Sequence, residues 1–284
     1  MTIDTRDIPA NGMTFRCRVA AATGEAVILL HGFPETSHMW IGLMERLAAE
    51  GYRCLAPDQR GYSPGARPDG AEHYRAEMIA ADVFALADAW GAERFHLVGH
   101  DWGAAAGWAA LALHPERVLS WTSLSVPHLV AFSSTIEHDP DQQTRSQYVV
   151  FFQQPGTAEA LFLANDYAAL KGIWTASPPD EVAEYVAVLG QPGALTAALN
   201  WYRAAGAARA EGAFAYEAPP VTTPTLFIWG NKDQAIGRKA AEANAPFMKG
   251  PYTFIELDAG HWLIQEEPEK VTAAILTHLA ENRA

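Results

Sequence analysis

The sequence predicts an α/β protein in which a mostly parallel sheet has helices on both faces and a helical lid is inserted. Three observations lead to this fold class. Short apolar strands alternate with amphipathic helices as far as His128, which is typical of parallel sheets with two buried faces. The alternation then stops, and from about residue 130 to residue 218 apolar side chains recur at helical spacing. Strand signals return at residue 225.

The predicted strands are short and end at turn signals. The first alternates apolar and polar residues after the Asn11-Gly12 turn signal, and several of the others are fully apolar. They span residues 13–19, 26–30, 52–56, 95–98, 118–126, 225–229 and 252–257. Apolar residues at helical spacing predict amphipathic helices between them, with one stripe formed by Trp40, Leu43 and Leu47 and another by Val83, Leu86, Ala87 and Trp90.

The interruption divides the chain into two predicted parts. Residues 1–129 and 219–284 form the α/β core, and residues 130–218 form a helical cap domain inserted into it. A chain of 284 residues is long enough for one large core with such an insertion.

One pentapeptide carries the strongest chemical signal. Gly99-His100-Asp101-Trp102-Gly103 follows a buried strand and precedes the helical run 104–110. A strand, a tight turn of the pattern G-x-nucleophile-x-G and a helix form the nucleophile elbow of the α/β-hydrolase fold. An aspartate at its centre displaces a leaving group from saturated carbon and forms an ester with the enzyme, whereas a serine attacks carbonyls. The alternative interpretation is that Asp101 caps the N-terminus of the helix.

Hydrolysis of such an ester needs a base and a group that orients the base. His261 is the favoured base among the ten histidines, because it directly follows the last predicted strand, at the edge of the sheet where sites lie. Asp233 follows the preceding strand and is the preferred orienting acid, with Asp258 as the weaker candidate. The chain order Asp101, Asp233, His261 is the nucleophile–acid–histidine order of this fold.

Two backbone N–H groups complete the predicted site. Phe33 lies in the segment 31–34, just past the end of a strand, and Trp102 directly follows the nucleophile. Their N–H groups form the expected oxyanion hole, which stabilises the tetrahedral intermediate of ester hydrolysis. The indole N–H of Trp102 is also a candidate donor to the substrate.

Three core motifs and two lid segments resemble the epoxide hydrolases of the α/β-hydrolase fold. The core motifs are HGFPE at 31–35, GHDWG at 99–103 and GHW at 260–262, and related dehalogenases carry variations of them. The more specific lid segments are YVVFFQQPG at 148–156 and NWYR at 200–203. The resemblance runs from about residue 13 to the C-terminus, and it implies that Tyr148 and Tyr202 are the two ring-opening tyrosines.

This resemblance implies conversion of a small-molecule epoxide to a vicinal diol without a metal or an organic cofactor. An opening epoxide leaves an alkoxide that needs a proton donor. Tyrosine suits that role, because with an ordinary pKa of about 10 it stays protonated at neutral pH. The alternative interpretation is that Tyr148 and Tyr202 are aromatic residues packed on helical stripes of the lid.

Two other functions remain open. A haloalkane or haloacid dehalogenase would use the same three residues, with a halide bound by the Trp102 indole. Phe33 stands where haloalkane dehalogenases often carry a halide-binding asparagine, and Trp102 and Ala105 stand where fluoroacetate dehalogenases carry arginines. A non-catalytic small-molecule sensor is the other alternative, and the intact set of three residues argues against it.

Composition and charge limit the classes of binding partner and the cellular location that we expect for the protein. The formal net charge of −13 disfavours nucleic acids and anionic membranes. Cys17 and Cys54 are too few for a disulfide scaffold, and the N-terminal residues lack the pattern of a signal peptide. No apolar run reaches membrane-spanning length. We therefore expect a cytoplasmic protein that binds neither nucleic acid nor membrane.

Overall fold

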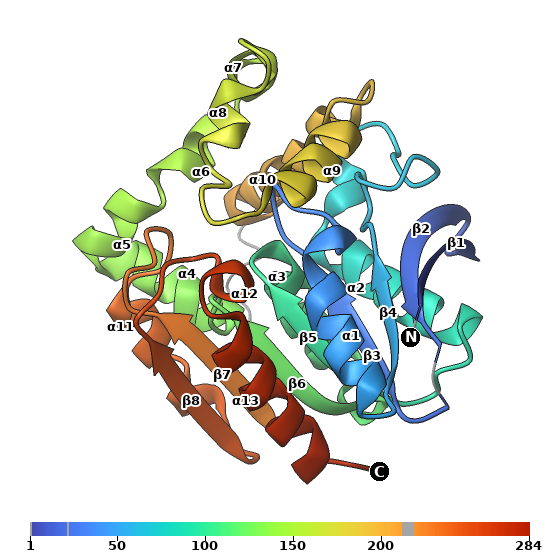
Figure 1. Cartoon of the computed structure of the whole chain (residues 1–284). Coiled ribbons are helices and arrows are strands. Elements are labelled where there is room, and N and C mark those ends of the chain that lie inside the picture. The colour runs from blue at the N-terminus through green and yellow to red at the C-terminus, as the bar shows by residue number, and fades with distance from the viewer. Residues whose placement is uncertain (1, 22, 212–218) are drawn as a thin grey trace.

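The computed structural model describes residues 2–21, 23–211 and 219–284, which contain a sheet of eight strands (Figure 1). The strands are β1 Ile3–Ala10, β2 Met13–Ala20, β3 Ala26–Leu30, β4 Arg53–Pro57, β5 Phe95–His100, β6 Val118–Leu124, β7 Thr225–Gly230 and β8 Tyr252–Leu257. They lie in the order β1-β2-β4-β3-β5-β6-β7-β8. Strand β2 is antiparallel to both of its neighbours, and the other pairs are parallel. The predicted mostly parallel sheet is confirmed.

The edge strand β1 is absent from the sequence prediction. Most of its side chains are exposed, so its sequence lacks an apolar face. It pairs with β2 across the Asn11-Gly12 turn, where both residues have positive φ angles, 50° and 74°. Such a two-residue turn matches the twist of a hairpin. The turn and the backbone pairing therefore form this strand without burial of an apolar stripe.

Helices cover both faces of the sheet, as predicted. The core helices are α1 Ile41–Ala49, α2 Ala76–Ala89, α3 Trp102–Leu113, α11 Arg238–Glu242, α12 Leu263–Glu266 and α13 Pro268–Glu281. Short 3-10 helices lie at η1 Ser37–Trp40, η2 Ala71–Tyr74, η3 Pro115–Arg117 and η4 Ala245–Phe247. Buried residues of α2 and α3 pack on one face of the sheet, and those of α1 and α13 pack on the other.

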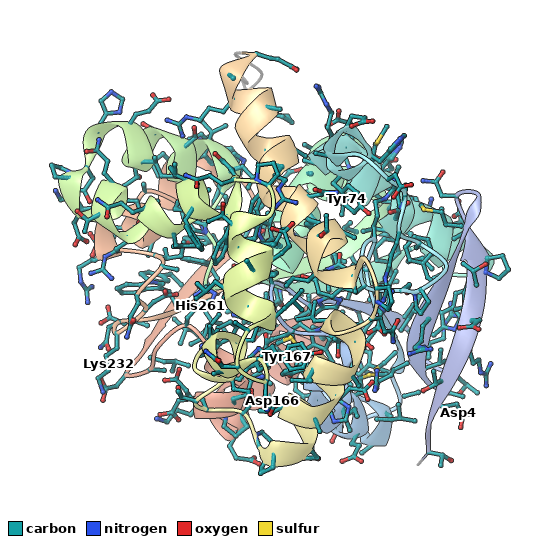
Figure 2. The ribbon with its side chains drawn as sticks, turned by 90° about the horizontal axis from the view of Figure 1, so that it is seen from above. Asp4, Tyr74, Asp166, Tyr167, Lys232 and His261 are labelled. Carbon is teal, nitrogen blue, oxygen red and sulfur yellow. The ribbon has the colours of Figure 1, made fainter. Side chains whose placement is uncertain are left out.

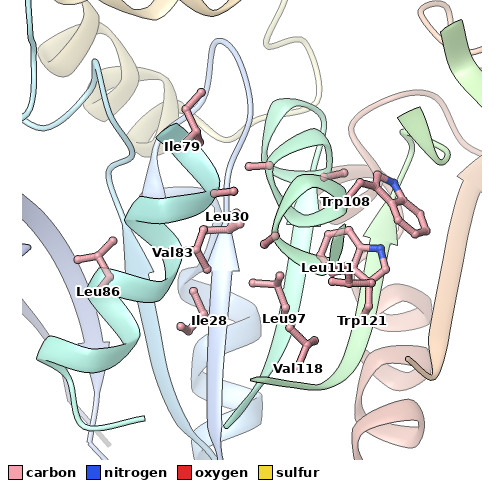
Figure 3. Close-up of a cluster of buried hydrophobic side chains, with 14 of the residues drawn as sticks. Ile28, Leu30, Ile79, Val83, Leu86, Leu97, Trp108, Leu111, Val118 and Trp121 are labelled. Carbon is pink, nitrogen blue, oxygen red and sulfur yellow. The ribbon is translucent and has the colours of Figure 1, made fainter. Parts of the chain in front are cut away.

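The packing of α3 on the sheet is close. Figure 3 shows Trp108 and Leu111 of α3 beside Trp121 of β6 and Leu97 of β5. The rings of Trp108 and Trp121 meet edge to face with centroids 5.4 Å apart. A Cβ atom on Gly107 would lie 2.0 Å from the ring of Trp121, so only glycine permits this approach. The tight contact holds α3, and with it the elbow at its N-terminus, against β5 and β6.

Between β6 and β7 the described residues form helices and no strand. These are α4 Leu129–His138, α5 Pro140–Arg145, α6 Gln147–Phe152, α7 Thr157–Leu163, α8 Ala168–Lys171, α9 Pro179–Leu189 and α10 Ala194–Ala210. In Figure 1, α6 to α10 lie above the sheet. The predicted end of the cap, residue 218, falls in 212–218, outside the described residues. Among the described helices none alone could span a membrane; α9 and α10 meet the length and composition test only as a pair bent by 84°.

The carboxyl ends of four neighbouring strands meet beneath these helices. Asp101 follows β5, Ser125 follows β6, Asp233 lies three residues after β7, and His261 lies four residues after β8. Strands β5, β6, β7 and β8 are consecutive neighbours in the sheet. In open α/β sheets this edge is where ligands bind. The sheet order therefore brings side chains from distant parts of the sequence to one place.

Candidate active site

Asp101 sits at a turn that requires glycine on both sides. Its φ of 51° and ψ of −120° are uncommon for a residue with a side chain. A Cβ on Gly99 would lie 2.4 Å from the carbonyl oxygen of Gly103, and one on Gly103 would lie 2.0 Å from that of Leu30. The Asp101 side chain makes no hydrogen bond that caps α3. The alternative interpretation of Asp101 as a helix cap is therefore wrong.

The Asp101 carboxylate receives its hydrogen bonds from the predicted oxyanion hole. The backbone N–H of Phe33 donates to Oδ1 at 2.8 Å, while Oδ2 lies 3.5 Å from Nε2 of His261. Burial raises the pKa of Asp101, but His261 and the backbone N–H of Trp102 outweigh burial and hold the pKa below its ordinary value. The carboxylate is therefore ionised at neutral pH, with Oδ1 held by the N–H group of Phe33 and Oδ2 directed toward His261.

His261 is paired with Asp233. Its Nδ1 lies 2.9 Å from Oδ2 of Asp233, which is buried. Burial lowers the pKa of His261, but the charges and hydrogen bonds of Asp233 and Asp101 outweigh it and raise the pKa well above 6.5. Asp258, the weaker candidate acid, instead forms an exposed ion pair with Lys232 at 3.0 Å. Figure 2, a view from above, shows His261 in the interior of the molecule and Lys232 at its rim.

Ser125 is a member of this cluster that the sequence prediction missed. Its hydroxyl donates to Oδ2 of Asp233 at 2.5 Å, and its Oγ lies 2.9 Å from Nδ1 of His261. The sequence prediction treats residues 118–126 as one strand, whereas β6 ends at Leu124 and Ser125 has a φ of 71°. The sequence carries no local signal for this position, because Ser120, Thr122 and Ser123 of the same strand are polar too.

A second set of polar side chains, two of them fully buried, contacts the loop that carries His261. His100 Nε2 lies 2.9 Å from the carbonyl oxygen of His261, and His100 Nδ1 lies 3.2 Å from Oε2 of Glu35. Gln265 donates from Nε2 to Oε1 of the same glutamate at 2.6 Å. Glu35 and His100 are fully buried. These contacts connect the HGFPE and GHDWG segments to the loop that carries His261, and they fix the position of its backbone.

The two predicted ring-opening tyrosines lie side by side, and Tyr202 packs on both residues of the predicted oxyanion hole. Tyr148 is in α6 and Tyr202 is in α10, with ring centroids 6.3 Å apart. The ring of Tyr202 contacts those of Trp102 and Phe33 edge to face, at 4.9 Å and 5.5 Å. Burial, and then the charge of Asp101, raise the pKa of both phenols well above 10. Both phenols are therefore proton donors at neutral pH.

Arg203 connects α10, which carries Tyr202, to α7, the helix that follows the one carrying Tyr148. Its Nη2 donates to Oε1 of Glu159 in α7 at 2.7 Å, and its Nη1 donates to Oδ1 of Asn200 at 3.1 Å. The side chains of Arg203 and Glu159 are only 10% and 12% exposed. A Cβ on Gly206 would lie 2.6 Å from Nε2 of Gln153, so α10 and the end of α6 are in close contact. The sequence does not reveal this partner of Arg203.

The cluster combines the ionised carboxylate of Asp101, a histidine held by a second carboxylate, and two neutral phenols. In the described part of the chain, no three His, Cys, Asp or Glu residues gather in a way that could hold a metal ion. A carboxylate beside proton donors can open a strained ether, and a histidine beside the resulting ester can activate water.

Comparisons with known proteins agree with this geometry. The model of the alpha/beta hydrolase fold family matches residues 25–268. The AB hydrolase superfamily protein YfhM of Bacillus subtilis and Epoxide hydrolase A of Mycobacterium tuberculosis are each 34% identical, and both matches cover 96% of either chain. The solved structure of Epoxide Hydrolase A from Mycobacterium thermoresistibile is 30% identical, with a TM-score of 0.81 and 98% of each chain covered. The chain therefore belongs to the α/β hydrolase fold family and is a relative of proteins named epoxide hydrolases.

Proposed function

We propose that this protein is an epoxide hydrolase that converts a small epoxide to a vicinal diol through a covalent ester of Asp101. The observation that carries the proposal is the pair of protonated phenols, Tyr148 and Tyr202, beside an ionised carboxylate. Proton donors beside a nucleophile suit a leaving group that becomes a basic alkoxide. The relatives named epoxide hydrolases support the same activity.

In the first step, Oδ2 of Asp101 attacks one carbon of the epoxide. The carbon–oxygen bond of the ring breaks as the new ester bond forms, and a phenol of Tyr148 or Tyr202 delivers its proton to the departing oxygen. Meanwhile the N–H group of Phe33 holds Oδ1, and the N–H group of Trp102 donates to the same carboxylate. The products are a hydroxyalkyl ester of the enzyme and a phenolate, which regains its proton from the protonated His261.

In the second step, His261 removes a proton from water, and the water oxygen attacks the carbonyl carbon of the ester. The carbonyl oxygen is the former Oδ1, so its developing negative charge already faces the N–H group of Phe33, while the N–H group of Trp102 donates to the same carboxyl group. Asp233 orients the imidazole through Nδ1. When the tetrahedral intermediate collapses, the ester bond breaks and His261 protonates the diol oxygen. The second proton of the water, left on the new carboxyl group of Asp101, then passes to His261, which restores the carboxylate and the protonated imidazole.

A single turnover in oxygen-18 water tests this route. With the enzyme in excess, the new oxygen of the first diol comes from Asp101 and is therefore unlabelled, while the label enters the Asp101 carboxylate. The covalent route is wrong if the first diol carries the label.

The two alternative functions can be distinguished from epoxide hydrolysis by the substrates that the protein turns over. A dehalogenase would release halide from organohalides and leave an epoxide panel untouched, and a sensor would bind a ligand tightly without turnover. The two phenols favour the epoxide, because a departing halide needs no proton.

We further propose that residues 130–218 act as a cap over the site. The cytoplasmic location also remains a prediction.

A further inference from the structure

We propose that Ser125 is a positioning residue that acts through Asp233 and His261 on ester hydrolysis and not on epoxide opening. This inference rests on the covalent route proposed above. The hydroxyl lies between the acid and the base of the site, and it belongs to neither the motifs nor the three residues that the sequence predicted.

The contacts of the Ser125 hydroxyl determine where its hydrogen and its lone pairs point. It donates its one hydrogen to Oδ2 of Asp233 at 2.5 Å, so its lone pairs are available to Nδ1 of His261 at 2.9 Å. Nδ1–H is then held by two oxygen atoms, which fixes the tautomer and leaves Nε2 facing Asp101.

Asp233 itself is saturated with donors when Ser125 is present. Its Oδ1 accepts the backbone N–H groups of Ala235 and Ile236 at 2.8 Å and 3.0 Å. Its Oδ2 accepts Ser125 and His261. Without the serine hydroxyl, the oxygen that orients the imidazole loses one of its two donors, and the carboxylate can rotate relative to the ring. Hydrogen bonds to charged groups are the stronger ones in proteins.

The backbone of Ser125 gives an independent observation. Its φ of 71° is a conformation that favours glycine, and the turn is held by a 2.8 Å hydrogen bond from its N–H to the Ile228 carbonyl. Ser123 further fixes the turn by donating to the Val126 carbonyl at 2.6 Å. Residues with strained backbone conformations cluster at functional sites. A role for the Ser125 hydroxyl in the site would explain why a serine, and not a glycine, occupies this strained position.

The two steps of the reaction separate the effect of Ser125 from a general defect. Epoxide opening uses Asp101 and the phenols, whereas hydrolysis uses His261 and Asp233. A variant that slows only hydrolysis accumulates the ester, so kcat and KM fall by the same factor and kcat/KM stays unchanged.

Three substitutions distinguish the hydroxyl from the backbone. Ser125→Gly suits the positive φ and removes the hydroxyl, and Ser125→Ala removes the hydroxyl without that relief. Ser125→Thr keeps the hydroxyl but places a β-branched residue at positive φ, so it lowers the melting temperature. We expect roughly 10- to 100-fold slower ester hydrolysis for the glycine and alanine substitutions, as for the loss of a hydrogen bond to a charged group. We expect hydrolysis near the wild-type rate for the threonine substitution.

The readout is the mass of the ester and its rate of decay in a rapid-quench single turnover. His261→Gln serves as the control, because it must accumulate the ester if the covalent route holds. If His261→Gln accumulates no ester, the proposed function fails. If it does accumulate ester while Ser125→Gly hydrolyses at the wild-type rate, or if Ser125→Thr is as slow as Ser125→Gly, the role of the Ser125 hydroxyl is overturned.

Discussion

Replacing both lid tyrosines with phenylalanine removes two phenol O–H groups and keeps both rings. Tyr202 is only 3% exposed and packs edge to face on Trp102 and Phe33, and Tyr148 packs on Phe152 in the same way. Phenylalanine retains these contacts, so the lid keeps its packing. The perturbation is therefore confined to the two groups that, in the proposed mechanism, donate to the epoxide oxygen.

The expected loss follows from the charge that develops on that oxygen. One hydrogen bond to a charged group contributes about 1.5–3 kcal/mol. This corresponds to roughly 10- to 150-fold in rate for each single substitution. The ring centroids are 6.3 Å apart and both phenols serve one oxygen, so their effects are not additive. For the double substitution we expect epoxide opening to slow by about 10²–10⁴-fold, the range of general acid catalysis.

The assay is the rate of ester formation in a rapid-quench single turnover, measured separately from ester decay. An alkyl halide that the enzyme accepts provides the matched control, since its leaving group needs no proton and its displacement should slow little. Epoxide opening within about threefold of wild type by the doubly substituted enzyme would show that the phenols are packing residues, because general acid catalysis contributes far more.

Three further predictions concern the site and the lid. A Cβ on Gly32 would lie 2.4 Å from Cβ of Asp101, so Gly32→Ala should lower kcat/KM at least about 100-fold, and activity near wild type would contradict the geometry. Arg203→Met leaves Glu159 buried without its partner, so urea denaturation should show a loss of about 3–5 kcal/mol in the free energy of unfolding. Lys232→Met, in an exposed pair, is its control and should cost less than about 1 kcal/mol; equal losses would refute the distinction. Burial lowers the pKa of His261, but Asp233 and Asp101 raise it by more. The protonated imidazole therefore stabilises the folded wild-type protein fully below pH 6.5, and this contribution to the free energy of unfolding is lost as the pH rises through the raised pKa. His261→Gln should lack this slope in denaturation curves from neutral to alkaline pH, and parallel curves for the two proteins would contradict the assignment.

The elements that the sequence predicts well are those whose burial leaves an apolar signature. Strands β3 and β5 to β7 are buried along their whole length, and their apolar runs identify them. Strand β1 has an exposed face on the edge of the sheet, so its formation depends on a turn and on backbone pairing, which leave little trace in composition.

The residues of the site likewise divide into those that the sequence predicts and those that it does not. The turn at Asp101 is predictable because its close contacts require glycines at fixed spacing. Ser125 is hidden because β6 already carries Ser120, Thr122 and Ser123, so one more polar residue before Val126 does not mark the end of the strand. The contacts of His100 with Glu35 and of Arg203 with Glu159 depend on which loops and helices the folded chain brings together, and no local pattern encodes that choice.

The position of His261 between Asp101 and Asp233 also sets the order of events. In the idle enzyme the imidazole carries a proton that both anions retain, so it cannot yet activate water. In the proposed route, ester formation cancels the charge of Asp101, and the proton becomes available to the phenolate left by ring opening. Hydrolysis then returns a proton from water to the imidazole, and the cycle closes without exchange with the surroundings. Formation of the ester thus converts His261 into the base that hydrolyses this same ester.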